Sequence, residues 1–314
     1  MLKYLTTKII YSVILLFGVL FIVFILLHLT GDPVSLMVSK QATPAEIESL
    51  RQELGFNRPL LVQFADFVKG ALQGDFGNSF RYRQPAMQLV LNRIPATIEL
   101  ATAALIMAVI IGVTMGILGG ANPNTIFDTM ARGLGLLGQT IPTFWLGLIL
   151  ILIFALNLGW FPTYGRETFQ LFGVHLPDKS IILPAFALSM FTMGQLVRFT
   201  RSAVMEVMNA DYVTTARSKG LRKMRIYLKY ILKNAAIPLI SIIGVQFSYL
   251  LSGSIYIETI FSWPGLGNLL AEAVSTRDFF LVQATAFFTS FVVIGLHLLT
   301  DFIYVLVDPR IRYE

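Results

Sequence analysis

Long apolar stretches separated by polar segments dominate this chain. An α-helix needs about 20 residues to cross a bilayer, and five of six stretches reach that length. The fourth is slightly shorter, but Arg198 at its end can extend its guanidinium to the interface along an apolar stem. The pattern therefore predicts an all-α integral membrane protein with six transmembrane helices. The stretches, which contain no Asp, Glu, Lys or Arg, are Ile9–Leu29, Leu100–Gly120, Gly133–Gly159, Ile181–Val197, Ala235–Ile257 and Phe279–Thr300.

The basic residues predict the orientation of these spans. Six spans place both termini on one side, which carries 14 Lys and Arg residues, whereas the two short opposite loops carry only Arg166, Lys179 and Arg277. Because cytoplasmic loops collect positive charge, both termini and Arg198–Asn234 are predicted to be cytoplasmic. The first span is longer than the core of a signal peptide and no cleavage pattern accompanies it, so we expect it to remain in the mature protein.

The segment after the first span reads as a small helical module outside the membrane. Thr43-Pro44-Ala45-Glu46 places a cap residue, a proline and an acid at the start of a helix, and Gly55 ends it. A second amphipathic stretch, Leu60–Leu72, ends at Gly74-Asp75-Phe76-Gly77. This module is either an inert cover or a docking surface. The predicted division is 1–30 (N-terminus and first span), 31–95 (external helical loop) and 96–314 (five-helix transmembrane core, with a cytoplasmic loop at about 201–234).

The outer loop before the last span is apolar but rich in Pro and Gly. Such irregular backbone persists near membrane depth only where protein or a cavity surrounds it. The pattern favours either an external gate or a tryptophan anchored at the interface, and Gly265 is expected to need a positive φ. The gate candidates are Phe261, Trp263, Pro264, Gly265, Leu266 and Gly267.

The cytoplasmic segment predicts two short helices joined by a glycine. Asp211 can cap a helix over Tyr212–Lys219, Gly220 supplies a left-handed stop, and a second amphipathic run covers Arg222–Lys233. Topology or attraction to anionic membrane lipid explains the basic residues but not this elbow.

Two stripes of small residues predict close helix contacts. Gly112, Gly116 and Gly120 recur every four residues in the second span. Gly244, Ser248 and Ser252 do the same in the fifth. Stripes of this kind mark packing within one subunit, a subunit interface or a pore wall.

Composition argues against an enzyme. Hydrophobic residues make up 55% of the 314 residues and charged residues 13%, against about 25% charged in soluble domains. Cysteine is absent, only three histidines occur, and no nucleotide cradle, zinc-protease motif or nucleophile elbow is present. We therefore expect no catalytic residue, no metal and no cofactor bound by this chain. Polar groups in or beside the spans are pathway candidates or helix-to-helix links: Gln195, Gln246, Gln283 and Asp301.

The cytoplasmic elbow resembles the corresponding loop of binding-protein-dependent ABC importer permeases. The matching residues are Asp211-Tyr212-Val213-Thr214-Thr215-Ala216-Arg217-Ser218-Lys219-Gly220, followed by Asn234 and Pro238. Thr214-Thr215-Ala216 stands where the family pattern has E-A-A, and Pro238 lies further from Gly220 than that pattern gives. Both departures resemble the peptide and nickel branch.

The resemblance extends along nearly the whole chain, to the first of the two permease subunits of dipeptide, oligopeptide, glutathione and nickel ABC importers. Phe279-Phe280 replaces the family's usual aromatic-Pro. The matching segments are Gly31-Asp32-Pro33, Gly74-Asp75-Phe76-Gly77-Asn78-Ser79, Arg93-Ile94-Pro95-Ala96-Thr97-Ile98-Glu99-Leu100, Glu258–Gly267 and Asp308-Pro309-Arg310-Ile311-Arg312.

This resemblance implies a type I ABC importer permease fold in a bacterial inner membrane. It also implies a second homologous permease, two cytoplasmic ATPase subunits that bind ATP and Mg, and an external substrate-binding protein, with no nucleic-acid partner. Peptide is favoured as the substrate over a nickel or other metal chelate, glutathione or another small solute; a membrane enzyme or channel is the alternative from another class. The residues implied to couple to the ATPases are Asp211, Tyr212, Thr215, Ala216, Arg217, Lys219, Gly220, Leu221 and Met224.

Overall fold

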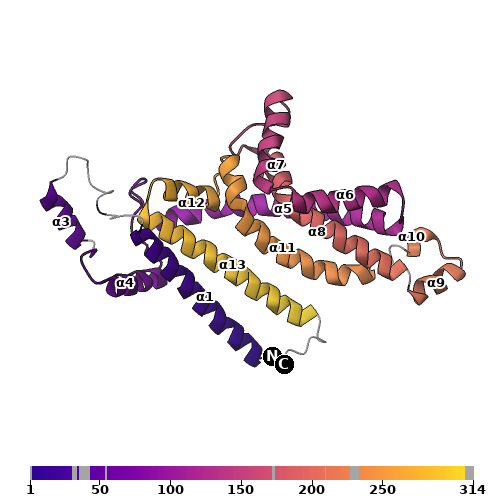
Figure 1. Cartoon of the computed structure of the whole chain (residues 1–314), viewed down its shortest axis with the longest axis horizontal. Helices are drawn as coiled ribbons and strands as arrows, with labels where there is room; N and C mark the ends of the chain where they lie inside the picture. Colours follow the sequence, from indigo (N-terminus) through magenta and orange to yellow (C-terminus); the bar gives the residue numbers. More distant parts are fainter. Residues whose placement is uncertain are drawn as a thin grey trace. The chain divides into compact units, whose positions relative to one another are not determined.

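The computed structural model describes residues 2–29, 34, 43–53, 55–171, 174–208, 210–226 and 233–307 (Figure 1). Contacts group the chain into two compact units, residues 1–95 with 265–314 and residues 96–264. Each unit is described by itself below. The division at residues 30 and 95 that the sequence suggested stays a prediction, as do the roles of Gly31-Asp32-Pro33 and Asp308–Arg312, which lie outside the described residues.

The first unit combines two long apolar helices with the helical module that follows α1. The helix α1 packs along α13, and α12 packs on the same helix. Phe76, Val90, Leu269 and Leu281 form its buried core together with alanines and further aromatic side chains. Its helices are α1 (Leu2–Leu29), α3 (Pro44–Glu53), α4 (Leu60–Gln73), the start of α5 (Ala86–Ala121), α12 (Leu266–Ser275) and α13 (Phe279–Val307).

The two predicted external helices are present with their predicted ends. The Thr43 backbone N–H and hydroxyl donate to the Glu46 carboxylate at 2.7 and 3.0 Å, and the Glu46 N–H donates back at 3.4 Å. This reciprocal capping box lowers the pKa of the exposed Glu46 carboxyl, with the hydrogen bond from the Thr43 backbone as the main cause. Gly74 ends α4 at φ 75°.

The second unit is built around the helix α8. Figure 1 shows α8 running beside α6 and α11, and both helices contact it along its length. Buried side chains therefore occur on most of its faces. The elements of this unit are the rest of α5, α6 (Ile126–Thr140), α7 (Thr143–Leu150), the π-helix η1 (Ile151–Asn157), β1 (Thr168–Leu171), β2 (Val174–Pro177), the 3₁₀ turn η2 (Lys179–Ile181), α8 (Ile182–Met208), α9 (Asp211–Ser218), α10 (Lys223–Ile226) and α11 (Lys233–Ile260).

A short hairpin departs from the all-α prediction. The strands β1 and β2 pair antiparallel, with Thr168 opposite Pro177 and Leu171 opposite Val174. They lie in the segment between the third and fourth predicted spans. The fold is helical apart from this two-stranded ribbon.

The third predicted span is not one straight helix. The segments Ile126–Thr140 and Thr143–Asn157 meet at an angle of 106°. Pro142 explains the break, because a proline removes a backbone donor and keeps the preceding residue extended; Ile141 has ψ 122°. The prediction of an unbroken helix across Gly133–Gly159 is therefore wrong.

The fourth predicted span is longer than the apolar stretch. The helix α8 continues past Val197, through Arg198 and Arg201, to Met208. The start of the predicted cytoplasmic loop therefore belongs to α8, because the buried face of this helix continues through Thr200 and Val204.

The described residues contain four helices that are long and apolar enough to span a membrane, or five if the bent pair counts as one span. The helix α11 covers the stretch predicted as the fifth span. The count of six spans and the external location of the loop after α1 stay predictions.

The glycine stripe of the second predicted span lies against α8. A Cβ on Gly116 would come within 2.5 Å of Thr200 Cβ, and one on Gly120 within 2.8 Å of the Arg201 carbonyl oxygen. The stripe therefore serves packing within this chain.

Candidate coupling surface and translocation path

The predicted elbow around Gly220 is held by a small apolar cluster. Val213 and Ala216 of α9 pack with Val204 of α8 and Ile226 of α10, and the partly buried Leu221 joins them. Gly220 has φ 70°, a left-handed conformation that favours glycine. The predicted helix and its glycine stop are confirmed, although α9 begins at Asp211 itself.

The coupling candidates divide into exposed and buried side chains. Tyr212 is 42% exposed, and Asp211, Thr215, Lys219 and Gly220 are also exposed. Ala216 is only 4% exposed and packs inside this chain, and its coupling role stays a prediction. The side chains of Arg217 and Met224 lie outside the described residues.

The first half of the gate candidate is a tightly anchored turn in the second unit. Phe261 and Trp263 are almost fully buried. The Trp263 Nε1–H donates to the Ala96 carbonyl oxygen at 2.8 Å, and the Trp263 backbone N–H donates to the Glu258 carbonyl oxygen at 2.8 Å. A tryptophan bound on both sides to backbone holds this turn in one position.

The second half of the gate candidate corrects the expectation about its glycines. Gly265 has φ −102° and ψ −173°, an extended conformation open to any residue, and it precedes α12. Leu266 and Gly267 belong to that helix, and both are buried. The left-handed residue of this motif is Ser262, at φ 48°. The prediction that Gly265 needs a positive φ is therefore wrong.

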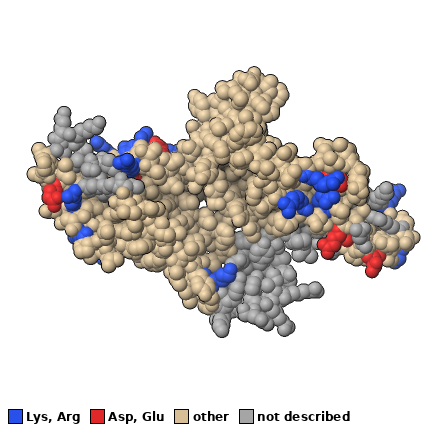
Figure 2. Space-filling view, in the orientation of Figure 1, with Lys and Arg blue, Asp and Glu red and all other residues tan. Residues whose placement is uncertain are grey.

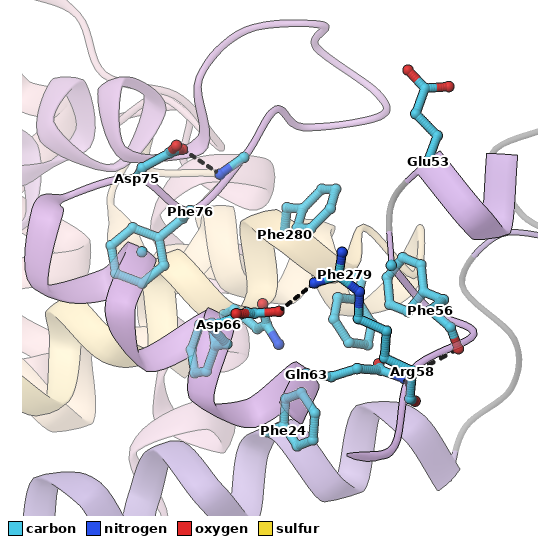
Figure 3. A pocket seen from close by; sticks show the side chains of 15 residues that line it. Phe24, Glu53, Phe56, Arg58, Gln63, Asp66, Asp75, Phe76, Phe279 and Phe280 are labelled. Atoms are coloured by element: carbon cyan, nitrogen blue, oxygen red, sulfur yellow. Dashed lines mark hydrogen bonds and ion pairs between the residues drawn. The ribbon is translucent and has the colours of Figure 1, made fainter. Parts of the chain in front are cut away.

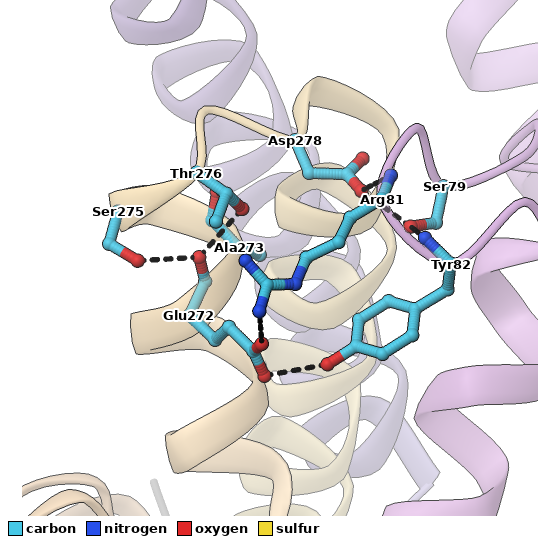
Figure 4. A network of polar contacts seen from close by, with 8 residues as sticks. All are labelled: Ser79, Arg81, Tyr82, Glu272, Ala273, Ser275, Thr276 and Asp278. Carbon is cyan, nitrogen blue, oxygen red and sulfur yellow. Dashed lines mark hydrogen bonds and ion pairs between the residues drawn. The ribbon is translucent and has the colours of Figure 1, made fainter.

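A polar network, which the sequence did not predict, fastens the 77–85 loop to α12 and α13 within the first unit (Figure 4). The buried Asp278 accepts hydrogen bonds from the Ser79 hydroxyl at 2.5 Å and from the Leu281 backbone N–H at 3.2 Å. The Glu272 carboxylate accepts a hydrogen bond from the Tyr82 hydroxyl at 2.7 Å. Arg81 pairs with the same carboxylate at 3.0 Å. Burial, followed by the Glu272 contact, raises the pKa of Tyr82.

The pathway candidate Gln283 lines a cavity of about 340 Å³ in the first unit. Figure 3 shows the phenyl rings of Phe24, Phe56, Phe279 and Phe280 around this space, with the Arg58–Asp66 ion pair at its edge. Gln283 is 3% exposed, and its Nε2 has no hydrogen-bond partner among the described residues.

Two other pathway candidates meet in the second unit. The Gln246 Nε2–H donates to Gln195 Oε1, and Gln246 Oε1 accepts the Thr192 hydroxyl at 3.3 Å. The side chain of the remaining candidate, Asp301, lies outside the described residues. The structure thus brings together two of the four predicted residues.

An ion-pair cluster at α6 and α8 was also missed by sequence reasoning. Asp128 is 1% exposed; its carboxylate accepts a hydrogen bond from Arg201 Nε at 2.6 Å and pairs with Arg132 Nη2 at 3.4 Å. The i,i+4 spacing of Asp128 and Arg132 is a signal for the helix pair, but nothing local points to Arg201. Among the described residues, no three His, Asp or Glu side chains gather as a metal site would require.

Two family models match this chain. Residues 108–313 match the family described as binding-protein-dependent transport system inner membrane component, and residues 1–101 match the N-terminal model for such membrane components. The chain belongs to this family. It is accordingly a multi-pass inner membrane component of a transport system.

Full-length relatives carry transport names. The oligopeptide transport system permease protein AppB of Bacillus subtilis is 36% identical, and 100% of each chain is covered. The glutathione transport system permease protein GsiC of Escherichia coli K12 is 36% identical, also with 100% of each chain covered.

A solved structure shares the fold. The inward-facing MetNI methionine ABC transporter matches with a TM-score of 0.53 and 17% identity, over 71% of this chain and 97% of that chain. This likeness identifies the ABC transporter permease fold.

Proposed function

We propose that this chain is the first of two permease subunits in an ATP-driven importer of short peptides. The observation that carries the proposal is similarity over the full length to relatives named for oligopeptide and glutathione transport. Hydrocarbon excludes a peptide because its amides would lose their hydrogen bonds to water. A polar path between helices, opened to one side at a time, meets that requirement.

In this proposal the chain has six spans with both termini in the cytoplasm. The excess of Lys and Arg on that side supports the orientation. The elbow formed by α9, Gly220 and α10 follows the end of α8, so it lies on the cytoplasmic side. The loop after α1 then faces outward, where a substrate-binding protein docks.

The elbow is the proposed contact with the ATPase subunits. Those subunits bind ATP and Mg and supply the energy, and this chain catalyses nothing. Tyr212 and Lys219 project from the elbow and are available to a groove on an ATPase. Ala216 and Val213 tie the elbow to Val204 of α8, so a movement of the elbow shifts the continuous helix α8.

The buried turn around Trp263 is the proposed external gate. Its backbone is irregular, and its two aromatic side chains, Phe261 and Trp263, are buried in protein, as irregular backbone at membrane depth requires. Because Trp263 is bonded to the carbonyl of Ala96 in α5, the turn is positioned by that helix.

ATP hydrolysis by the assembled complex tests this function. The chain is co-expressed with the second permease, the ATPases and the binding protein, purified, and placed in lipid nanodiscs. We expect hydrolysis to rise when the binding protein carries a dipeptide or an oligopeptide, and to stay basal with a nickel chelate. Stimulation by the chelate alone, or by glutathione alone, would identify that compound as the substrate in place of dipeptides and oligopeptides. Failure to co-purify with any ATPase would reject the importer in favour of a channel or an enzyme.

A further inference from the structure

A second cavity, of about 630 Å³, lies between α6 and α8 within the second unit. Figure 2 shows a group of basic side chains over this part of the molecule, where Figure 1 labels α6. Three arginines line the cavity: Arg132 from α6, and Arg198 and Arg201 from α8. Gln139 and Gln195 line it as well.

The cavity has an excess of positive charge. Asp128 is the single described carboxylate paired with these arginines, and it is shared by Arg132 and Arg201. Arg198 donates from Nη1 to the neutral Gln139 Oε1 at 2.7 Å, and no described carboxylate pairs with it. Most of the donors of its guanidinium are thus left for another acceptor.

This charge lies at the end of the apolar part of α8. Arg198 and Arg201 lie about 24 and 28 Å along α8 from Ile182, at 1.5 Å per residue. The hydrocarbon core of a bilayer is about 30 Å thick. Arg198 and Arg201 therefore lie at one end of the span, where their guanidinium groups reach the interface and can meet a solute that enters or leaves the path.

Side-chain amides continue the polar surface beyond the arginines. Gln195 in the cavity is bonded to Gln246, which in turn accepts the Thr192 hydroxyl. This series runs back along α8, away from its arginine-bearing end. A lipid acyl chain gains nothing from amide groups, whereas peptide amides need such partners when they leave water.

We infer that this cavity binds the terminal carboxylate of a peptide during its passage through the permease. Arg198 supplies the charge-assisted hydrogen bonds, and the shared Asp128 holds Arg201 and Arg132 in place beside it. The glutamine side chains bond to the peptide backbone. This assignment rests on the proposed function in peptide import.

Direct binding to the complex tests the assignment without the binding protein. The nucleotide-free complex in phosphatidylcholine nanodiscs is titrated with a fluorescent tripeptide bearing a free C-terminal carboxylate, and separately with the same tripeptide as its C-terminal amide. We expect the free acid to bind about tenfold more tightly, the contribution of a hydrogen bond to a charged group. Arg198→Gln should remove this preference, and Arg198→Lys should keep part of it.

Arg58→Gln is the matched control, because Arg58 forms an exposed ion pair far along the chain from this cavity and should leave the preference intact. Co-purification of all subunits as a monodisperse complex verifies the fold of each variant. Equal binding of acid and amide, or no binding of either at millimolar concentration, would overturn the assignment.

Anionic lipid is the rival occupant, and a second arm separates it. The titrations are repeated in nanodiscs containing phosphatidylglycerol. If Arg198→Gln changes the lipid dependence of ATP hydrolysis but not the acid preference, the cavity binds a lipid phosphate and the assignment is wrong. Failure of peptide-loaded binding protein to stimulate hydrolysis in the wild type would instead reject the proposed function.

Discussion

Gly138→Ala should weaken the contact between α6 and α8 that shapes the arginine-lined cavity. A Cβ at Gly138 would come within 2.6 Å of the Met190 carbonyl oxygen and 3.0 Å of Gly194 Cα. Both neighbours are backbone atoms, so the two helices must separate locally. Overfilling a packed contact of this kind costs about 1–3 kcal/mol. The better helix propensity of alanine offsets at most about 1 kcal/mol of this destabilisation.

Gly133→Ala is the matched control on the same helix. A Cβ at Gly133 meets nothing within 4 Å, so only the propensity gain of up to about 1 kcal/mol applies. The two variants should therefore differ by about 1–3 kcal/mol, with Gly138→Ala the less stable. The stabilities of the two variants are compared by heating each complex and measuring the loss of the monodisperse peak with fluorescence-detected size-exclusion chromatography. Equal midpoints for the two variants would refute the close packing of α6 on α8.

Three further predictions concern the turn around Trp263, the elbow, and the polar network of the 77–85 loop. Trp263→Phe removes the indole hydrogen bond to the Ala96 carbonyl and underfills a fully buried site, so it should cost about 1–3 kcal/mol in the same thermal assay, whereas Trp160→Phe, at an exposed side chain, should be neutral. Gly220→Val places a β-branched residue at φ 70°, a strain of about 1–3 kcal/mol, and should lower peptide-stimulated ATP hydrolysis; Gly220→Asn, which tolerates this conformation, should retain it. The raised pKa of Tyr82 means that the folded state holds the phenol proton more tightly than the unfolded state. The contribution of Tyr82 to the free energy of unfolding is therefore complete below about pH 10 and is lost as the pH rises through the folded-state pKa. The wild-type melting midpoint should consequently fall more than that of Tyr82→Phe between about pH 8 and about pH 10.5, and parallel losses would contradict the Tyr82–Glu272 contact.

Local patterns predicted the parts of the fold that depend on neighbouring residues. The capping box at Thr43 and Glu46 and the left-handed stops at Gly74 and Gly220 appear where the sequence indicated them. The break at Pro142 also had a local signal, which the unbroken apolar composition of that stretch outweighed.

Contacts between distant segments could not be read from the chain. Asp128 and Arg201 are 73 residues apart, and Ser79 and Asp278 are 199 apart, so no periodicity relates them. Ala216 belongs to a recognisable loop motif, yet its burial depends on how α9 folds back on α8. For the same reason the sequence supplied glutamines as pathway candidates but not the arginine-lined cavity beside Gln195.

Uptake of labelled peptide into sealed proteoliposomes is the direct test of ATP-driven peptide import through this chain. Vesicles hold the complete complex, with ATP and Mg supplied on the side of the ATPases and peptide-loaded binding protein on the other. We expect accumulation that requires ATP, the binding protein and this chain, and that stops when ATP is replaced by a non-hydrolysable analogue. Accumulation that continues with the analogue, or that needs no binding protein, would contradict an ATP-driven permease and identify the chain as a passive channel.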